Sequence, residues 1–267
     1  MELYFRKQGS GPALVIAHGL YGSSDNWLNM GKRLAERYTV YLIDLRNHGR
    51  SPSSDNHSFN DLRDDLIEFF DKHDIKKATL IGHSMGGKVA MWFAAEYPER
   101  VEKLVIADIA PKNYLEVGNN NQFNFHRNIL LAMKELDFTR MKNRNEAEDQ
   151  LSEKIDDTRV IKFLLKSIKR DKKSHQYKWQ LNVDALYNHL DEIVGGVNRQ
   201  WFDDRIPILN YPVIFIRGME SNYILPEDET LIKEIYPEAS IVDIPGAGHW
   251  LHAEKPKEFM KAVMRCC

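Results

Sequence analysis

The chain has 267 residues, of which 43% are hydrophobic and 28% charged, and its net charge is −2 at neutral pH. This balance is typical of one globular domain, with or without an insertion, and it gives no reason to expect a nucleic-acid partner. No apolar run reaches the roughly 20 residues that span a bilayer, and the first residues lack the pattern of a signal peptide.

The two cysteines, Cys266 and Cys267, are neighbours at the end of the sequence, where a disulfide could not staple a core. We therefore expect a reducing, cytoplasmic location. No cluster of Cys and His has the spacing of metal ligands, and no motif indicates a cofactor, so neither a metal nor a cofactor is expected.

The first part of the chain alternates short apolar runs with helical patterns. We predict an edge strand within residues 2–7 and buried strands at 13–17 and 40–43, because continuous apolar runs between turn residues are typical of parallel sheets. The spacing of apolar residues predicts helices over 25–37 and 59–73.

Two loops of this first part carry polar residues. The loop after strand 13–17 begins with His18-Gly19, where hydrolases place a backbone oxyanion donor, here the N–H of Leu20. The alternative is a plain loop with His18 packed beneath it. The loop from Asp44 to Pro52 contains Arg46 and His48. We interpret its polar side chains as structural, because a buried loop backbone needs hydrogen-bond partners.

The most informative stretch is Gly82-His83-Ser84-Met85-Gly86, which follows the apolar run 78–81 and precedes a helical pattern over 88–97. Strand, Gly-x-Ser-x-Gly and helix in this order form the context of a nucleophile elbow. We predict that Ser84 is a nucleophile held in a strained conformation, with glycines where a Cβ would clash. The N–H of Met85 would face an oxyanion.

A further apolar run, 103–107, ends at Asp108. Strands that alternate with helices imply a parallel sheet, and ligand-handling residues lie at the carboxyl ends of such strands. Ser84, Asp108 and the His18-Gly19 loop should therefore meet at one edge of the sheet.

Residues 112–205 show no buried strand pattern and many charges, with helical periods at 123–136, 146–155, 159–168 and 183–194. We predict a helical cap inserted into a core formed by residues 1–111 and 206–267. The cap contains a basic run from Lys166 to Lys178. Charge runs usually face water, which favours a solvated helix end and loop; the alternative is a surface for an anionic substrate such as a CoA phosphate.

The alternating pattern resumes with strands at 211–218 and 239–244 and helices at 227–235 and 258–265. The last strand leads into a glycine-rich loop that carries His249. A serine hydroxyl needs a histidine base, and the base needs a carboxylate that fixes its tautomer. We therefore predict His249 as the base, while His83 and His252 are expected to pack structurally.

The order Ser84, Asp108, His249 is the Ser–Asp–His order of α/β hydrolases. With the elbow and the loops described above, the chain resembles the α/β-hydrolase superfamily over nearly its whole length. The resemblance implies an α/β fold with a mostly parallel, doubly wound sheet. More closely, the chain is similar to bacterial YbfF-type esterases, which carry a small helical cap and act on acyl esters and acyl-CoA thioesters.

One departure bears on the acid of the triad. Most relatives carry Asp in a Gly-x-x-Asp pattern after the strand that ends at Gly218, and Ser221 stands at that position here. A serine cannot hold an imidazolium by charge, so we favour Asp108 as the acid, with Glu220 as the alternative. The YbfF-type resemblance implies the same arrangement, with Ser221 as an accessory that bonds the His–Asp pair.

The leading interpretation is a serine esterase or thioesterase that acts on a small acyl substrate. A lyase or carbon–carbon hydrolase like those of the menaquinone pathway, and a non-catalytic binding module, are the alternatives. We expect the substrate pocket to be shaped by Tyr21, Phe123, Phe125 and Trp250.

Overall fold

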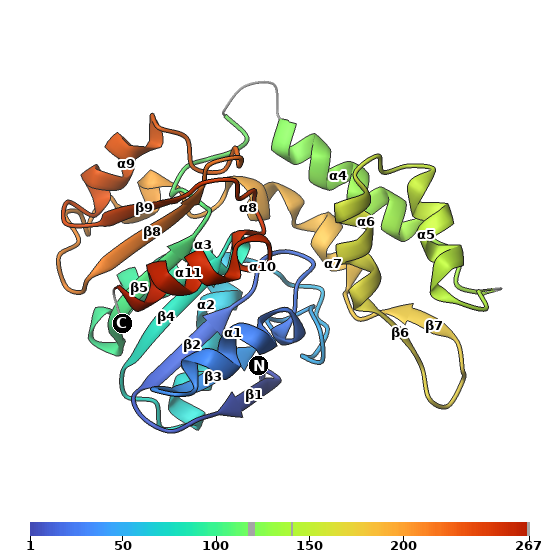
Figure 1. Cartoon of the computed structure of the whole chain (residues 1–267), viewed down its shortest axis with the longest axis horizontal. Helices are drawn as coiled ribbons and strands as arrows, with labels where there is room; N and C mark the ends of the chain where they lie inside the picture. The colour runs from blue at the N-terminus through green and yellow to red at the C-terminus, as the bar shows by residue number, and fades with distance from the viewer. Residues whose placement is uncertain (117–120, 140, 266–267) are drawn as a thin grey trace.

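The computed structural model describes residues 1–116, 121–139 and 141–265; the cysteines at 266 and 267 lie outside them. Its centre is a seven-stranded sheet in the order β1–β3–β2–β4–β5–β8–β9 (Figure 1). The strands are β1 (Phe5–Gln8), β2 (Ala13–Ala17), β3 (Thr39–Ile43), β4 (Ala78–His83), β5 (Val101–Ala107), β8 (Val213–Gly218) and β9 (Ser240–Ile244). Only the edge pair β1–β3 of this sheet is antiparallel, so the predicted α/β-hydrolase sheet is confirmed.

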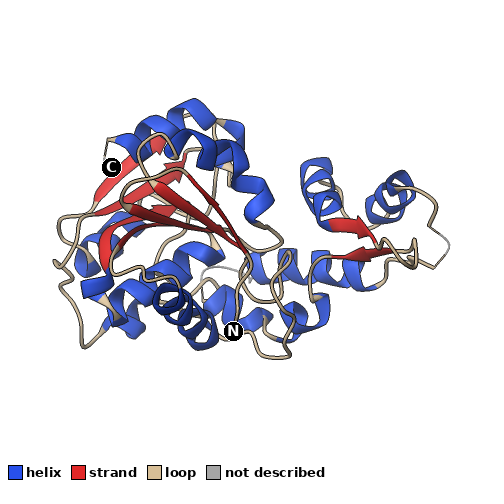
Figure 2. Ribbon diagram, turned by 90° about the horizontal axis from the view of Figure 1, so that it is seen from below, coloured by secondary structure: helices blue, strands red, loops and turns tan. Residues whose placement is uncertain are grey.

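Helices cover both faces of the sheet (Figure 2). Successive residues of β2 alternate between two buried clusters, with Leu14 and Ile16 in one and Val15 in the other. This alternation explains why the parallel strands are continuously apolar. The helices of the core are α1 (Leu28–Leu34), α2 (Phe59–Lys72), α3 (Met85–Glu96), α9 (Asp228–Ile235), α10 (Leu251–Glu254) and α11 (Pro256–Met264). Among the residues described, no helix is both long and apolar enough to cross a membrane.

Between β5 and β8 the chain leaves the sheet and forms a helical insert, which lies to the right of the sheet in Figure 1. Its helices are α4 (Asn121–Lys134), α5 (Arg144–Ser152), α6 (Thr158–Leu164), α7 (Val183–Asn188) and α8 (Leu190–Gly195). The chain returns from the insert to the amino end of β8, whereas the insert begins at the carboxyl end of β5, at one edge of the sheet. The insert is therefore well placed to contribute side chains to a site at this edge.

The basic run of the insert faces water, as expected, since Arg170, Lys172, Lys173 and Lys178 are exposed, but it is not simply a helix end and loop. It forms a hairpin of β6 (Ile168–Arg170) and β7 (Tyr177–Trp179), with Ile168 opposite Trp179. Ile168 is fully buried, and the Trp179 indole donates to the Met133 carbonyl at 3.0 Å. A β-branched and an aromatic residue paired on one face stabilise a hairpin. The packing of this pair on the insert therefore sets the local structure, which the pattern of charge does not predict.

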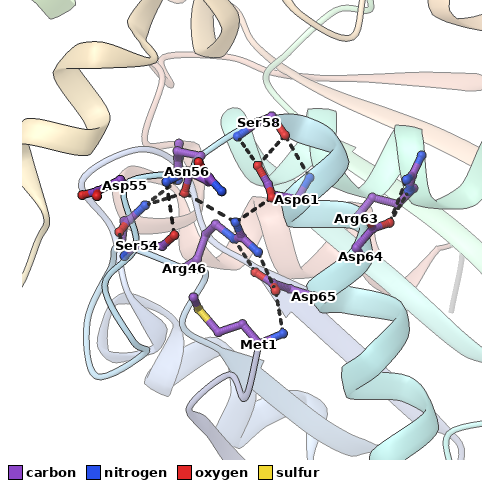
Figure 3. Close-up of polar contacts among 12 residues, drawn as sticks. Met1, Arg46, Ser54, Asp55, Asn56, Ser58, Asp61, Arg63, Asp64 and Asp65 are labelled. Carbon is purple, nitrogen blue, oxygen red and sulfur yellow. Dashed lines mark hydrogen bonds and ion pairs between the residues drawn. The ribbon is translucent and has the colours of Figure 1, made fainter.

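The polar loop after β3 is structural, as predicted. Arg46 makes two hydrogen bonds to the Asp65 carboxylate, at 2.6 and 2.8 Å, and an ion pair with Asp61 at 3.0 Å (Figure 3). The N-terminal ammonium of Met1 also pairs with Asp65, at 2.9 Å. Asp65 is 1% exposed, so these cations compensate a buried carboxylate and tie the loop to α2.

Replacing Arg46 with Met should lower the free energy of unfolding by about 3 kcal/mol, because the buried carboxylate of Asp65 loses its bidentate partner. Urea unfolding would measure the change. Lys77→Met is the control, because Lys77 pairs with Glu102 on the surface, and this variant should stay within about 0.5 kcal/mol of the parent. Equal losses in the two variants would contradict the assignment of Arg46 to a buried structural pair.

Candidate active site

Ser84 lies at the turn between β4 and α3, with φ 53° and ψ −122°. A non-glycine residue rarely adopts a positive φ, so the backbone is strained at this point. Hydrogen bonds keep Ser84 in this strained conformation. Its N–H donates to the Ala107 carbonyl at 3.0 Å, and its carbonyl accepts the first hydrogen bonds of α3. The predicted elbow is therefore present in the fold, and Ser84 is 8% exposed.

The two glycines of the elbow are needed because the backbones on either side approach closely. A Cβ on Gly82 would lie 2.4 Å from the Gly86 carbonyl oxygen in the first turn of α3. A Cβ on Gly86 would lie 2.4 Å from the carbonyl oxygens of Ala17 and His18, at the end of β2. Both distances are far below van der Waals contact, so a side chain at either position would push the turn out of place.

Asp108 follows β5 directly and is completely buried. It also has a positive φ, of 52°, and its N–H donates to the Ile216 carbonyl of β8 at 2.9 Å. One carboxylate oxygen accepts from the Gly218 N–H at 3.0 Å. The other accepts from the Ser221 hydroxyl and from His249 Nδ1, the latter at 2.8 Å. Three donors from two segments, the turn at the end of β8 and the loop after β9, thus hold one carboxylate in a single orientation.

His249 lies in the loop after β9 and connects the other two residues. Because a carboxylate only accepts hydrogen bonds, Nδ1 carries the proton that bonds Asp108, and Nε2 is left as an acceptor. Nε2 lies 3.0 Å from the Ser84 hydroxyl oxygen. The structure therefore brings together Ser84, His249 and Asp108 in the predicted arrangement. Glu220, the alternative acid, is exposed and lines a cleft beside them.

His83 and His252, which were expected to pack structurally, both lie near the site and make structural contacts. The ring of His83 donates to the His249 carbonyl at 2.8 Å, and burial lowers its pKa. His252 stacks on Trp27, with ring centroids 4.2 Å apart, and burial lowers its pKa to about 3. Both rings are therefore neutral at physiological pH, which suits the packing role that the sequence predicts.

The predicted oxyanion donors belong to the segments on either side of Ser84. Met85 is the first residue of α3, where the helix leaves an N–H without an intrahelical acceptor. Leu20 lies in the loop after β2, which His18 holds from below: Nε2 accepts from the Leu45 N–H at 3.0 Å and Nδ1 donates to the Gly19 carbonyl at 2.8 Å. Leu20, Met85 and Ser84 line one small cavity.

A cleft of about 510 Å³ opens above Ser84 and His249. Its walls include Tyr21, Phe125 and Trp250, three of the four residues expected to shape the pocket. The fourth, Phe123, is not among the described residues that line the cleft. It is partly buried and packs against the hydrophobic core. The cleft face of α4 carries residues 121, 122, 125, 126 and 129, and position 123 falls on the neighbouring face of the helix.

A series of contacts between side chains, not expected from the sequence, joins the insert to the site. The Tyr223 ring stacks on the His249 ring, with centroids 3.7 Å apart. Its hydroxyl is hydrogen-bonded to His126 of α4 at 2.9 Å, and the other nitrogen of His126 lies 3.2 Å from the Tyr21 hydroxyl. Burial lowers the pKa of His126 to about 3, so this ring is neutral. The helical spacing of the cleft residues of α4 is the only sequence signal for His126.

Lys88 was also missed, although it lies one helical turn after Ser84. It is 1% exposed, and its ammonium donates to the carbonyls of Val194 and Gly196, at 2.9 and 2.5 Å. Burial lowers the pKa of Lys88 to about 7. A lysine in a helix pattern is usually taken as a surface residue. The sequence does not reveal the buried position of Lys88, because its carbonyl acceptors come from a distant part of the chain.

Within the described ranges, no group of three His, Cys, Asp or Glu residues is placed to hold a metal ion.

Comparisons with known proteins identify the family to which this fold belongs. The model of the α/β hydrolase fold family matches residues 12–256. Esterase YbfF of Escherichia coli is 33% identical over 97% of this chain and 94% of that protein. The sn-1-specific diacylglycerol lipase ABHD11 of Danio rerio is 37% identical over 97% of this chain and 80% of that protein. The structure of a marine microorganism esterase matches with a TM-score of 0.91 and 44% identity, over 100% of this chain and 99% of that one.

The family match spans nearly the whole chain, and the YbfF and ABHD11 relatives are more than 30% identical over most of their own length. The fold, the elbow and the order of the site residues are those that the sequence predicts. The chain therefore belongs to the α/β-hydrolase family, among its YbfF-like esterases.

Proposed function

We propose that this chain is a serine hydrolase that cleaves carboxylic esters, and the corresponding acyl thioesters, through an acyl-enzyme intermediate. The observation that carries the proposal is the unbroken series of contacts from Ser84 to His249 and on to Asp108, at 3.0 and 2.8 Å. The esterase and lipase names of the relatives support the same class of substrate.

In the proposed reaction, His249 Nε2 takes the hydroxyl proton of Ser84 as the oxygen attacks the acyl carbon. The buried carboxylate of Asp108 stabilises the imidazolium that forms, and Ser221 and the Gly218 N–H hold this carboxylate in place. His249 then gives the proton to the leaving alcohol or thiol as its bond to the acyl carbon breaks, and the acyl group remains attached to the Ser84 oxygen as an ester. A water molecule, activated by the same ring, releases the acid.

The negative charge that develops on the carbonyl oxygen needs donors that are already in position. We propose the backbone N–H groups of Leu20 and Met85, which flank Ser84 in the small cavity. The helical insert acts as a cap in this proposal, because α4 supplies Phe125 and His126 to the cleft wall. Tyr21, Phe125 and Trp250 would then contact the substrate directly.

Replacing Ser84 with Ala should reduce the turnover of short p-nitrophenyl esters by about 10⁴-fold or more, because the nucleophile is lost. The variant should also lose covalent labelling by a fluorophosphonate. Ser240→Ala, which alters an exposed serine of β9, is the control for labelling and should behave as the parent. A folded Ser84→Ala protein with full activity would refute the proposed nucleophile.

Replacing Asp108 with Asn should lower kcat by about 10⁴-fold, because an amide favours the wrong tautomer of His249 and cannot stabilise its cationic form. Glu220→Gln should lose far less, since Glu220 is exposed at the edge of the cleft. Steady-state kinetics of the two variants measure the difference. If Glu220→Gln loses activity and Asp108→Asn keeps it, the acid has been assigned to the wrong residue.

Replacing Ser221 with Ala should lower kcat by about ten-fold, the value of one hydrogen bond to a charged group. Asp108 keeps the Gly218 N–H and His249 as partners in this variant, so the loss should be much smaller than for Asp108→Asn. Kinetics with the same ester test this order. A loss as large as that of Asp108→Asn would show that Ser221 does more than support the carboxylate.

A further inference from the structure

Two cavities of very different size meet at the proposed nucleophile. The cleft of about 510 Å³ and a small cavity of about 30 Å³ both contact Ser84 and Leu20. They are divided by side chains that line both, namely Gln122, His126 and Tyr223. His249 lines the cleft. Of the described residues that line the small cavity, Met85 and Lys88 belong to α3, and His249 is not among them. The space on the two sides of the reacting carbonyl is therefore unequal.

The chemistry of ester cleavage decides which part of the substrate takes which space. The leaving oxygen or sulfur must receive its proton from His249 Nε2, so this half of the substrate lies on the side of the histidine. The carbonyl oxygen faces the backbone donors next to Ser84. The remaining substituent of the carbonyl carbon is the acyl chain, which must then lie beside the donor residues Leu20 and Met85, and these residues line the small cavity.

We propose that the small cavity is the acyl site and the cleft is the leaving-group site, so that the enzyme selects short acyl groups carried by large alcohols or thiols. This inference rests on the proposed function, because it uses the assigned roles of Ser84 and His249. A cavity of 30 Å³ has room for roughly two water-sized groups, which corresponds to an acetyl or propionyl group. The cleft is large enough for a bulky leaving group.

The walls of the small cavity are fixed by contacts between core and insert. Ile109 comes from the core, and Ile193 and Val194 come from α8 of the insert. Lys88 ties the two together, because its ammonium donates to the Val194 and Gly196 carbonyls at the end of α8. A longer hydrocarbon chain would have to displace this wall or lie against a buried cation, and both are unfavourable.

A pair of isomeric esters tests the assignment directly. Hexyl acetate and ethyl hexanoate contain the same atoms and leave similar primary alcohols, but they carry their long chain on opposite sides of the ester. We expect kcat/KM to be at least about ten-fold higher for hexyl acetate, because the hexanoyl chain cannot enter the small cavity. Equal or faster cleavage of ethyl hexanoate would overturn the inference.

The same experiment separates this inference from the proposed function. If neither isomer is cleaved and a fluorophosphonate does not label Ser84, the proposed serine esterase is wrong. If both isomers are cleaved and labelling occurs, the ratio of their rates tests the acyl site alone. No knowledge of the natural substrate is needed for this comparison.

Matched variants locate the selectivity. Ile193→Ala enlarges the small cavity and should shift the ratio toward ethyl hexanoate by about ten-fold. Phe125→Ala alters only the wall of the cleft, so it should change the dependence on alcohol length while keeping the preference for acetate. Ile109→Val, a smaller change in the same cavity, provides the test if Ile193→Ala does not fold. A folded small-cavity variant with the parental ratio would contradict the assignment.

Discussion

The bond between the Asp108 carboxylate and the His249 ring joins residues that are 141 positions apart in the chain, and most of the site depends on it. It fixes the tautomer of the histidine, which in turn decides that Nε2 can accept from Ser84. A completely buried carboxylate is costly unless it is hydrogen-bonded, and here three donors surround it. The sheet order β4–β5–β8–β9 makes this possible, because it puts the ends of these strands side by side.

Much of this arrangement could be predicted from the sequence because it follows from local chemistry. The strands of the core are buried on both faces and so read as apolar runs, and Gly82 and Gly86 mark a turn that tolerates no side chain. Asp108 could be proposed because Ser221 occupies a position where an acid is usual. In the structure Ser221 donates to that same carboxylate, so the two positions compensate each other.

What the sequence could not predict depends on contacts between distant segments. The basic run of the insert forms a hairpin because Ile168 and Trp179 pack inward, and charge patterns carry no information about such packing. His126 and Lys88 were missed for the same reason, since the partners of each lie about 100 positions away. Phe123 was wrongly placed in the pocket because apolar character alone does not say which face of α4 meets the cleft.

These long-range contacts divide the work of the site between two parts of the chain. The core supplies Ser84, Asp108 and His249 from the ends of strands whose positions are fixed by the sheet. The insert supplies walls to both cavities, because α4 lines the cleft and the small cavity and α8 lines the small cavity. The insert reaches the triad through His126, which bonds the hydroxyl of the core residue Tyr223, and Tyr223 in turn stacks on His249. The proposed reaction depends on a few positions of the core, so on this proposal changes in the insert would alter selectivity without altering the reaction.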